Sequence, residues 1–233
     1  MPRRIPTDRF EELLRAATAV FLEQGYRRTQ MADVAERLGV AKGSVYTYVE
    51  SKEALLDLVL RHADRTEPVA LPERLPVPTP SSRATLAALR KRMAREGALP
   101  ALRTARGRAR VRDTRAELEL VLGELYDALA RHRISIKLMD RCAPDYPELA
   151  RLWFRAGRQR ALALLTRLFE RRARGGRLRR FEDPQLAARL VLETLTFWAV
   201  HRHFDPAPQR FDETTVRRNV LAFLIAALSK QTR

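Results

Sequence analysis

A short stretch, residues 42–48, carries polar side chains where a buried helix would carry leucines. It reads KGSVYTY and offers a lysine amine together with the hydroxyls of Ser44, Thr47 and two tyrosines. Amines and hydroxyls bind phosphate oxygens and base edges, and a glycine lets a backbone approach closely. Only Val45 and Val49 form an inward-facing pair, at the i, i+4 spacing. The stretch is therefore expected to face the major groove of DNA rather than a protein core.

Three short helices are expected to position these side chains. Apolar residues recur at helical spacing over residues 10–21, and Gly25 ends that helix. A second helix begins at Thr29, a good N-cap residue, and stops at Gly39, which suits a positive φ. The third helix covers residues 42–49. A tight glycine turn between the second and third helices is typical of a helix-turn-helix.

Several short motifs follow one another in order along residues 8–60. They are Gly25-Tyr26, Thr29, Val34-Ala35, Leu38-Gly39-Val40, Gly43-Ser44-Val45-Tyr46 and Ser51-Lys52-Glu53-Ala54-Leu55-Leu56. In this order and spacing they resemble the TetR family of transcriptional regulators. Two positions depart from the family pattern. Ala41 stands where the family commonly has a Ser or Thr cap, and Val49 stands where it usually has Phe.

The resemblance implies a double-stranded DNA operator as partner and gives roles to individual residues. Those implied nearest to base edges are Lys42, Ser44 and Thr47, and Gly43 leaves out a side chain on that crowded surface. Those implied to contact phosphate are Thr29 through its hydroxyl, Tyr46, Tyr48 and Lys52, with Arg3 and Arg4 as an arm toward a neighbouring groove. The alternatives are a half-buried packing role for Tyr46 and a solvated charge for Lys52.

The whole chain is expected to be all-α, in three parts. Residues 1–65 form the helix-turn-helix domain, and residues 82–233 form a helical domain for effector binding and dimerisation. Between them, residues 66–81 contain five prolines, a density that no helix tolerates. That segment is predicted to be a semi-rigid linker or an extended strap.

Two later helices, over residues 184–200 and 212–229, are apolar on more than one face, which calls for two packing partners. A four-helix bundle between two protomers would supply both, so a homodimer is expected. The predicted interface residues are Leu190, Val191, Leu195, Val220, Phe223, Leu224 and Ala227. An ordinary buried core is the alternative for both helices.

The resemblance also implies a pocket for a small-molecule effector in the C-terminal domain. The candidate lining residues are Met93, Leu122, Tyr126, Met139, Trp153, Phe154 and Trp198. Each of them could equally be plain core. The expected function is that of a ligand-responsive regulator, a repressor by the commonest mode of the family, which binds a pseudo-palindromic operator as a dimer and is released by its effector.

The net charge of +17 is concentrated outside the motif region, because residues 1–65 carry 11 basic and 10 acidic side chains. Of the basic residues 40 are arginine, a skew that codon composition could also produce. A strongly basic chain leaves open a second hypothesis, a non-specific architectural DNA-binding protein.

Other classes of protein find little support in the sequence. One cysteine, Cys142, excludes an internal disulfide, and no combination of residues predicts a catalytic site, a metal site or a cofactor. His201 and His203 are two residues apart, which is poor spacing for metal on a helix. No apolar stretch reaches the roughly 18 residues of a membrane span. We therefore expect a cytoplasmic protein that is not an enzyme and has no membrane partner.

Overall fold

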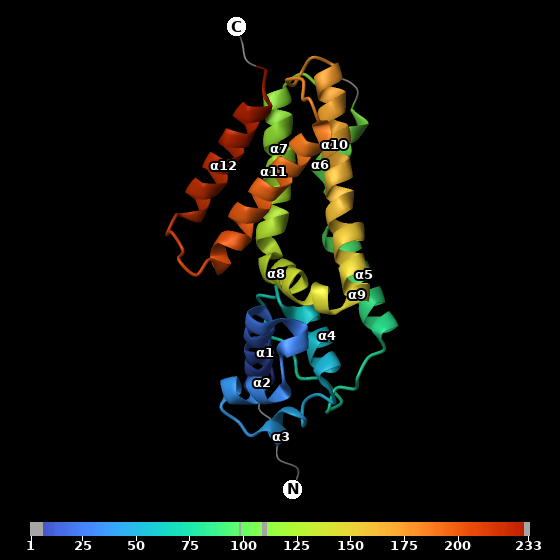
Figure 1. The fold of residues 1–233 in the computed structure, drawn as a ribbon, viewed down its shortest axis with the longest axis vertical. Coiled ribbons are helices and arrows are strands. Elements are labelled where there is room, and N and C mark those ends of the chain that lie inside the picture. Colours follow the sequence, from blue (N-terminus) through green and yellow to red (C-terminus); the bar gives the residue numbers. More distant parts are fainter. Residues whose placement is uncertain (1–6, 98, 109–110, 231–233) are drawn as a thin grey trace. The chain divides into compact units, whose positions relative to one another are not determined.

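The computed structural model describes residues 7–97, 99–108 and 111–230 (Figure 1). The all-α prediction is confirmed: helices dominate the described residues, and Val49 and Val77 form an isolated parallel β-bridge. No helix in those ranges is long and apolar enough to cross a membrane. The α-helices are α1 (Thr7–Arg28), α2 (Met31–Leu38), α3 (Lys42–Val45), α4 (Lys52–His62), α5 (Ser82–Glu96), α6 (Pro100–Gly107), α7 (Thr114–Arg131), α8 (Arg133–Cys142), α9 (Pro147–Ala150), α10 (Gln159–Arg174), α11 (Pro184–Ala199) and α12 (Glu213–Leu228).

The helices group into two compact units. The first contains the chain up to Arg92 and the segment Ile134–Trp153, and the second contains Met93–Arg133 and the chain from Phe154 onward. The first unit thus adds most of α5, α8 and α9 to the four N-terminal helices. The division at residues 65 and 81 expected from the sequence stays a prediction.

In the first unit, α1 packs on α2 and α4 through a core that includes Phe10, Phe21 and Leu55, all fully buried. The helical backbone of α1 breaks at Gly25, where φ is +78°. A Cβ there would lie 3.2 Å from the carbonyl oxygen of Arg141 in α8, so a glycine is also required by close approach.

In the second unit, α7 and α11 pack on each other, and each also contacts α12 (Figure 1). A buried ion pair joins α7 to α10: Arg172 donates to both carboxylate oxygens of Glu117, at 2.6 and 2.7 Å. Arg172 also donates to the carbonyl oxygens of Ala105 and Arg108, which lie at and just beyond α6. Because each charge is fully hydrogen-bonded, the pair fixes three segments of this unit together.

Residue type alone predicts helix starts at Ser51, Asp183 and Asp212, and the structure confirms each of them. The Ser51 hydroxyl accepts from the Ala54 amide at 3.1 Å at the start of α4. Asp183 caps α11 with Pro184 at its first position, and Asp212 caps α12.

Other local predictions were wrong. The third helix is one turn, Lys42–Val45, followed by a non-helical turn, rather than a helix over residues 42–49. Gln30, not Thr29, caps α2, through a capping box with Asp33. Pro147 suits a first helical position and predicts a long helix from that residue, but a π-helical segment, η2 (Arg151–Arg158), interrupts this helix. The sequence analysis did not foresee α8.

Candidate nucleic-acid interface

The turn and the third helix are held by a few buried apolar side chains. Val45 and Val49 are fully buried, as predicted, and Val34 of α2 is buried with them. Gly39 adopts the left-handed conformation, φ +71°, and its amide donates to carbonyl oxygens near the end of α2. The chain can therefore reverse tightly and present α3 at the surface.

The exposed side of this element carries the predicted polar residues. Lys42, Gly43 and Thr47 are exposed, Tyr46 is 41% exposed, and Ser44 is partly exposed. The Thr47 hydroxyl donates to the carbonyl oxygen of Ser44 at 2.7 Å, which leaves its oxygen lone pairs facing outward. The structure thus gathers these five residues on a single short segment.

Packing within the described chain does not require a glycine at position 43. A Cβ added to it would meet no heavy atom within 4 Å, and its φ is not in the left-handed region. An alanine would therefore fit and would favour the helix. The absence of a side chain is useful only if something outside the described chain approaches this backbone closely.

Three of the predicted DNA-contacting side chains make contacts within the chain, and the DNA contacts given to them stay predictions. Thr29 is 1% exposed, and its hydroxyl donates to the carbonyl oxygen of Gly25 at 2.6 Å. Tyr48 is 9% exposed, with its ring stacked on Phe10. Lys52 donates to two backbone carbonyl oxygens, both at 3.0 Å. These contacts help to hold the exposed surface in place.

The residues around Lys52 form a small polar cluster. Its ammonium lies 4.5 Å from the centre of the Tyr26 ring, and the Tyr26 hydroxyl donates to Glu53 at 2.6 Å. Burial, followed by this hydrogen bond, raises the pKa of Tyr26, and the same hydrogen bond lowers the pKa of Glu53. The cluster fastens the end of α1 to the start of α4.

The proline-rich segment, residues 66–81, is fastened beside the recognition turn. The Val77 amide donates to the Tyr48 carbonyl at 2.8 Å, and the Glu50 amide donates to the Val77 carbonyl at 3.0 Å. Thr79 adds two bonds, from its amide to the Glu50 carboxylate and from its hydroxyl to the Ser51 hydroxyl, both 2.8 Å. Of the two predicted forms, the structure has the extended strap.

The far end of α4 is tied to later helices of the same unit. Arg92 of α5 donates to the carbonyl oxygen of Leu60 and, at 2.9 Å, to the Asp64 carboxylate just beyond α4. The Ser135 amide of α8 donates to the other Asp64 oxygen at 3.0 Å. Through these bonds a movement of α5 or α8 would act directly on α4.

The seven predicted pocket residues are not brought together as one set. Met139 and Trp153 belong to the first unit and the other five to the second. Leu122, Tyr126 and Met139 are buried, and Met93, Phe154 and Trp198 are partly exposed. A small cavity of about 30 Å³ in the first unit has none of the seven in its wall. Its lining includes Tyr26, Asp57, Leu86 and Tyr146.

The predicted dimer residues divide by exposure. Val191, Leu195, Val220 and Leu224 are buried within the protomer. Leu190 is 61% exposed, Phe223 is 70% exposed, and Ala227 is also exposed. Leu186 and Phe197 of α11 are also exposed, at 56% and 45%, and of these two the sequence analysis did not name Leu186. The i, i+4 spacing of Leu186 and Leu190 was the signal that could have revealed the outward stripe.

Comparison with known proteins supports this arrangement. Residues 13–59 match the family model for bacterial regulatory proteins of the tetR family, and residues 114–226 match the C-terminal domain of AefR-like transcriptional repressors. Together the two matches span more than half of the chain.

Individual relatives match over a short part of the chain. The HTH-type transcriptional repressor KstR2 of Mycolicibacterium smegmatis is 38% identical over 56 residues, 24% of this chain and 27% of that protein. The HTH-type transcriptional activator FasR of the same organism is 41% identical over 63 residues, 26% of this chain and 29% of that protein. The chain thus matches only about a quarter of the length of these curated relatives.

Solved structures show the same fold along the whole chain. The ketosteroid regulator KstR2 of Mycobacterium tuberculosis superposes with a TM-score of 0.55 at 20% identity, covering 98% of both chains. PfmR of Thermus thermophilus superposes with a TM-score of 0.52 at 23% identity, covering 95% of this chain and 99% of that one. With both family models matched in order and this fold shared, the chain belongs to the TetR family of transcriptional regulators.

Proposed function

We propose that the protein is a ligand-responsive transcriptional repressor that binds a pseudo-palindromic DNA operator as a homodimer. Membership in a family of regulators supports the general role, and the repressor KstR2 among its relatives supports the direction of control. In this proposal the protein acts in the cytoplasm, catalyses no reaction and needs no cofactor.

The observation that carries the proposal is the exposed surface of α3 and its turn. Lys42, Ser44, Tyr46 and Thr47 offer donors and acceptors there, and Gly43 leaves its backbone uncovered. A major groove accepts such a surface, because small and hydroxyl side chains allow close approach to base edges. We assign base contacts to Lys42, Ser44 and Thr47 and a phosphate contact to Tyr46.

A single one-turn reading helix buries little surface, so two copies are required for tight binding. Half-sites one helical turn apart are separated by about 34–36 Å, and a dimer combines their affinities. The exposed apolar side chains on α11 and α12, among them Leu190 and Phe223, are the proposed contact between protomers.

Release by an effector would follow from a shift in population. A small molecule that binds better to a conformation with a different separation of the reading heads lowers operator affinity, typically by about 1–3 kcal/mol. The bonds from Asp64 to α5 and α8 support α4 as the lever. The predicted lining residues in the second unit remain the candidates for the effector pocket.

The test is fluorescence anisotropy with DNA fragments that flank the protein's own gene, in moderate salt with excess competitor DNA. We expect saturable binding to one fragment at two protomers per site. The double variant Lys42→Ala, Tyr46→Ala should lose this discrimination while the charge of the C-terminal region stays unchanged. Full discrimination in the double variant would refute the assigned contacts.

The alternative is a non-specific architectural DNA-binding protein, favoured by the net charge of +17. Such a protein would bind every fragment equally, and its affinity would fall steeply with salt. Equal binding to flanking fragments and to a library of random duplexes would favour this alternative.

A further inference from the structure

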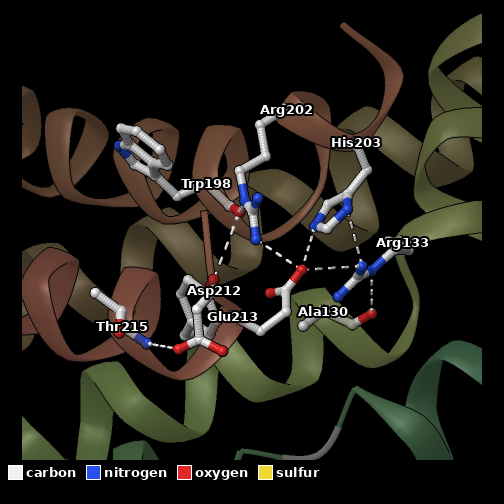
Figure 2. A network of polar contacts seen from close by, with 9 residues as sticks. Ala130, Arg133, Trp198, Arg202, His203, Asp212, Glu213 and Thr215 are labelled. Carbon is white, nitrogen blue, oxygen red and sulfur yellow. Dashed lines mark hydrogen bonds and ion pairs between the residues drawn. The ribbon is translucent and has the colours of Figure 1, made fainter. Parts of the chain in front are cut away.

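Three nitrogen donors in the second unit converge on the carboxylate of Glu213 (Figure 2). Three distances end on Glu213 Oε1: 2.6 Å from Arg202 Nη2, 3.2 Å from His203 Nε2 and 3.7 Å from Arg133 Nη1. Arg133 begins α8, Arg202 and His203 lie in the 3₁₀ segment η3 (His201–Phe204), and Glu213 begins α12.

The three donors crowd on one oxygen of this acceptor. All three face the same oxygen, Oε1, although an ionised carboxylate has two oxygens and about four lone-pair sites. Two buried nitrogens, Nη2 of Arg202 and Nε2 of His203, are close to Glu213, yet neither has a well-formed hydrogen bond among the described residues. An acceptor with several oxygens could serve each donor separately.

The donors are held in place without Glu213. Arg202 Nε donates to the Trp198 carbonyl at 2.8 Å, and Arg133 Nε donates to the Ala130 carbonyl at 3.0 Å. Nη1 of Arg133 lies 3.1 Å from Nδ1 of His203, and this contact directs Nε2 of the same ring toward Glu213. The site is therefore pre-organised, and its Arg202 side chain is only 12% exposed.

Glu213, by contrast, sits in a position from which it can leave. Its side chain is 51% exposed in the first turn of α12, directly after the non-helical residues 205–212. The Asp212 carboxylate caps the helix independently, by accepting from the Thr215 amide at 2.7 Å. Rotation of Glu213 into solvent would leave α12 intact.

The cluster also touches two of the predicted pocket residues. The Tyr126 hydroxyl lies 3.5 Å from the Trp198 carbonyl, which is the oxygen that accepts from Arg202. A ligand lying against Tyr126 and Trp198 would bring an acidic group within reach of Arg202. This adjacency gives the cluster a place in effector binding.

We propose that Arg133, Arg202 and His203 form a binding site for an oxyanion, a phosphate or a carboxylate of the effector, which Glu213 covers in this structure. The proposal rests on the proposed function for its regulatory meaning. An incoming oxyanion replaces Glu213, supplies separate oxygens to the three donors, and frees the first turn of α12. Because α12 also carries Phe223 of the proposed dimer surface, occupancy would be linked to the packing of that surface.

The test needs no DNA, so its result is independent of operator binding. Inorganic phosphate and acetate are titrated, with chloride keeping ionic strength constant, while the ring protons of the four histidines are followed by NMR. The signal of His203 is assigned by its loss in His203→Gln. We expect a saturable shift of that signal with at least one probe, and the stronger probe identifies the class of oxyanion.

Two carboxylate variants form a matched pair. Neutralising the covering carboxylate in Glu213→Gln should lower the dissociation constant about tenfold, the equivalent of roughly one charge-assisted hydrogen bond. Glu193→Gln is the control, because Glu193 also binds two arginines, Arg158 and Arg189, at 2.5 and 2.6 Å. That variant should leave the titration unchanged.

The outcomes separate clearly. Loss of the shift in Arg202→Gln, or in Arg133→Gln should the first variant fold poorly, supports the site. The absence of a saturable shift in Glu213→Gln with either probe overturns the proposal. So do equal shifts of all four histidines or full retention of binding in a folded Arg202→Gln protein, since both indicate diffuse attraction to a basic chain.

Discussion

Two surfaces of this protein expose groups that its own core does not use, and they differ in chemistry and in support. The α3 surface, residues 42–47, is polar and rests on a single helical turn held by buried neighbours. The α11–α12 surface, with Leu186, Leu190, Phe197 and Phe223, is apolar and rests on two helices of 16 residues each.

The contrast indicates two kinds of partner. A polar face with an uncovered glycine suits DNA, because its backbone can approach the groove closely and its side chains can form hydrogen bonds there. An exposed row of leucine and phenylalanine side chains suits another protein surface. Damage to one surface should therefore leave the function of the other measurable, which the following variants exploit.

The largest effect is expected on the apolar surface. In the double variant Leu190→Asp, Phe223→Asp, two exposed apolar anchors become charges, and dimer affinity should fall about 1000-fold at roughly 2 kcal/mol for each anchor. Sedimentation velocity measures the monomer fraction. Leu120→Asp changes an exposed leucine of α7, 67% exposed, and should leave the dimer intact. A dimer that survives in the double variant would place the interface elsewhere.

The next effect is expected at the polar surface. Lys42→Ala should lower operator affinity about tenfold and reduce the slope of log affinity against log salt by about one, because one cationic contact is lost. Anisotropy titrations at several salt concentrations measure both quantities. Lys91→Ala removes an exposed lysine of α5 and is the matched control. An equal change of slope in the two variants would argue for diffuse binding.

A substitution at Gly43 should change protein stability and operator affinity in opposite directions. Gly43→Ala should raise the free energy of unfolding by about 0.5–1 kcal/mol, because alanine favours the helix and a Cβ meets nothing in the chain. Operator affinity should nevertheless fall severalfold, because the new methyl group lies between backbone and groove. Thermal unfolding and anisotropy provide the two measurements.

The control is a substitution at Gly39 in the neighbouring turn, which should lower stability rather than raise it. Gly39 has a φ of +71°, so Gly39→Ala should lower the free energy of unfolding by about 1 kcal/mol. Unchanged operator binding by a stabilised Gly43→Ala protein would show that α3 does not approach the DNA backbone at that residue.

What the sequence could predict is governed by short-range chemistry. The caps at Ser51, Asp183 and Asp212, the break at Gly25 and the all-α class depend on residues within one or two helical turns of each other. The exposure of residues 42–47 also follows from a local pattern, since Val45 is the one aliphatic side chain among them.

What it missed depends on contacts between distant residues. Glu117 looks like a capping partner for Thr114, but it binds Arg172, 55 residues away in the sequence. The cluster around Glu213 combines Arg133 with a histidine 70 residues further on. No local spacing announces such pairs, because the tertiary fold alone brings them together.

The smallest effect tests how the one-turn α3 surface is supported. Thr79→Val keeps the shape of the side chain and removes the 2.8 Å hydrogen bond from the Thr79 hydroxyl to Ser51, while the Thr79 amide bond to Glu50 remains. We expect the free energy of unfolding to fall by about 1 kcal/mol. Operator affinity should fall about twofold, since the strap would hold the recognition turn less firmly.

The control is Thr66→Val, at an exposed threonine near the start of the strap, which should change neither the free energy of unfolding nor operator affinity. The bonds of Thr79 lie within the first unit, whereas α11 and α12 belong to the second, so dimer affinity should be the same in both variants. A dimer weakened by Thr79→Val would show that the strap stabilises the whole protein rather than the polar surface alone.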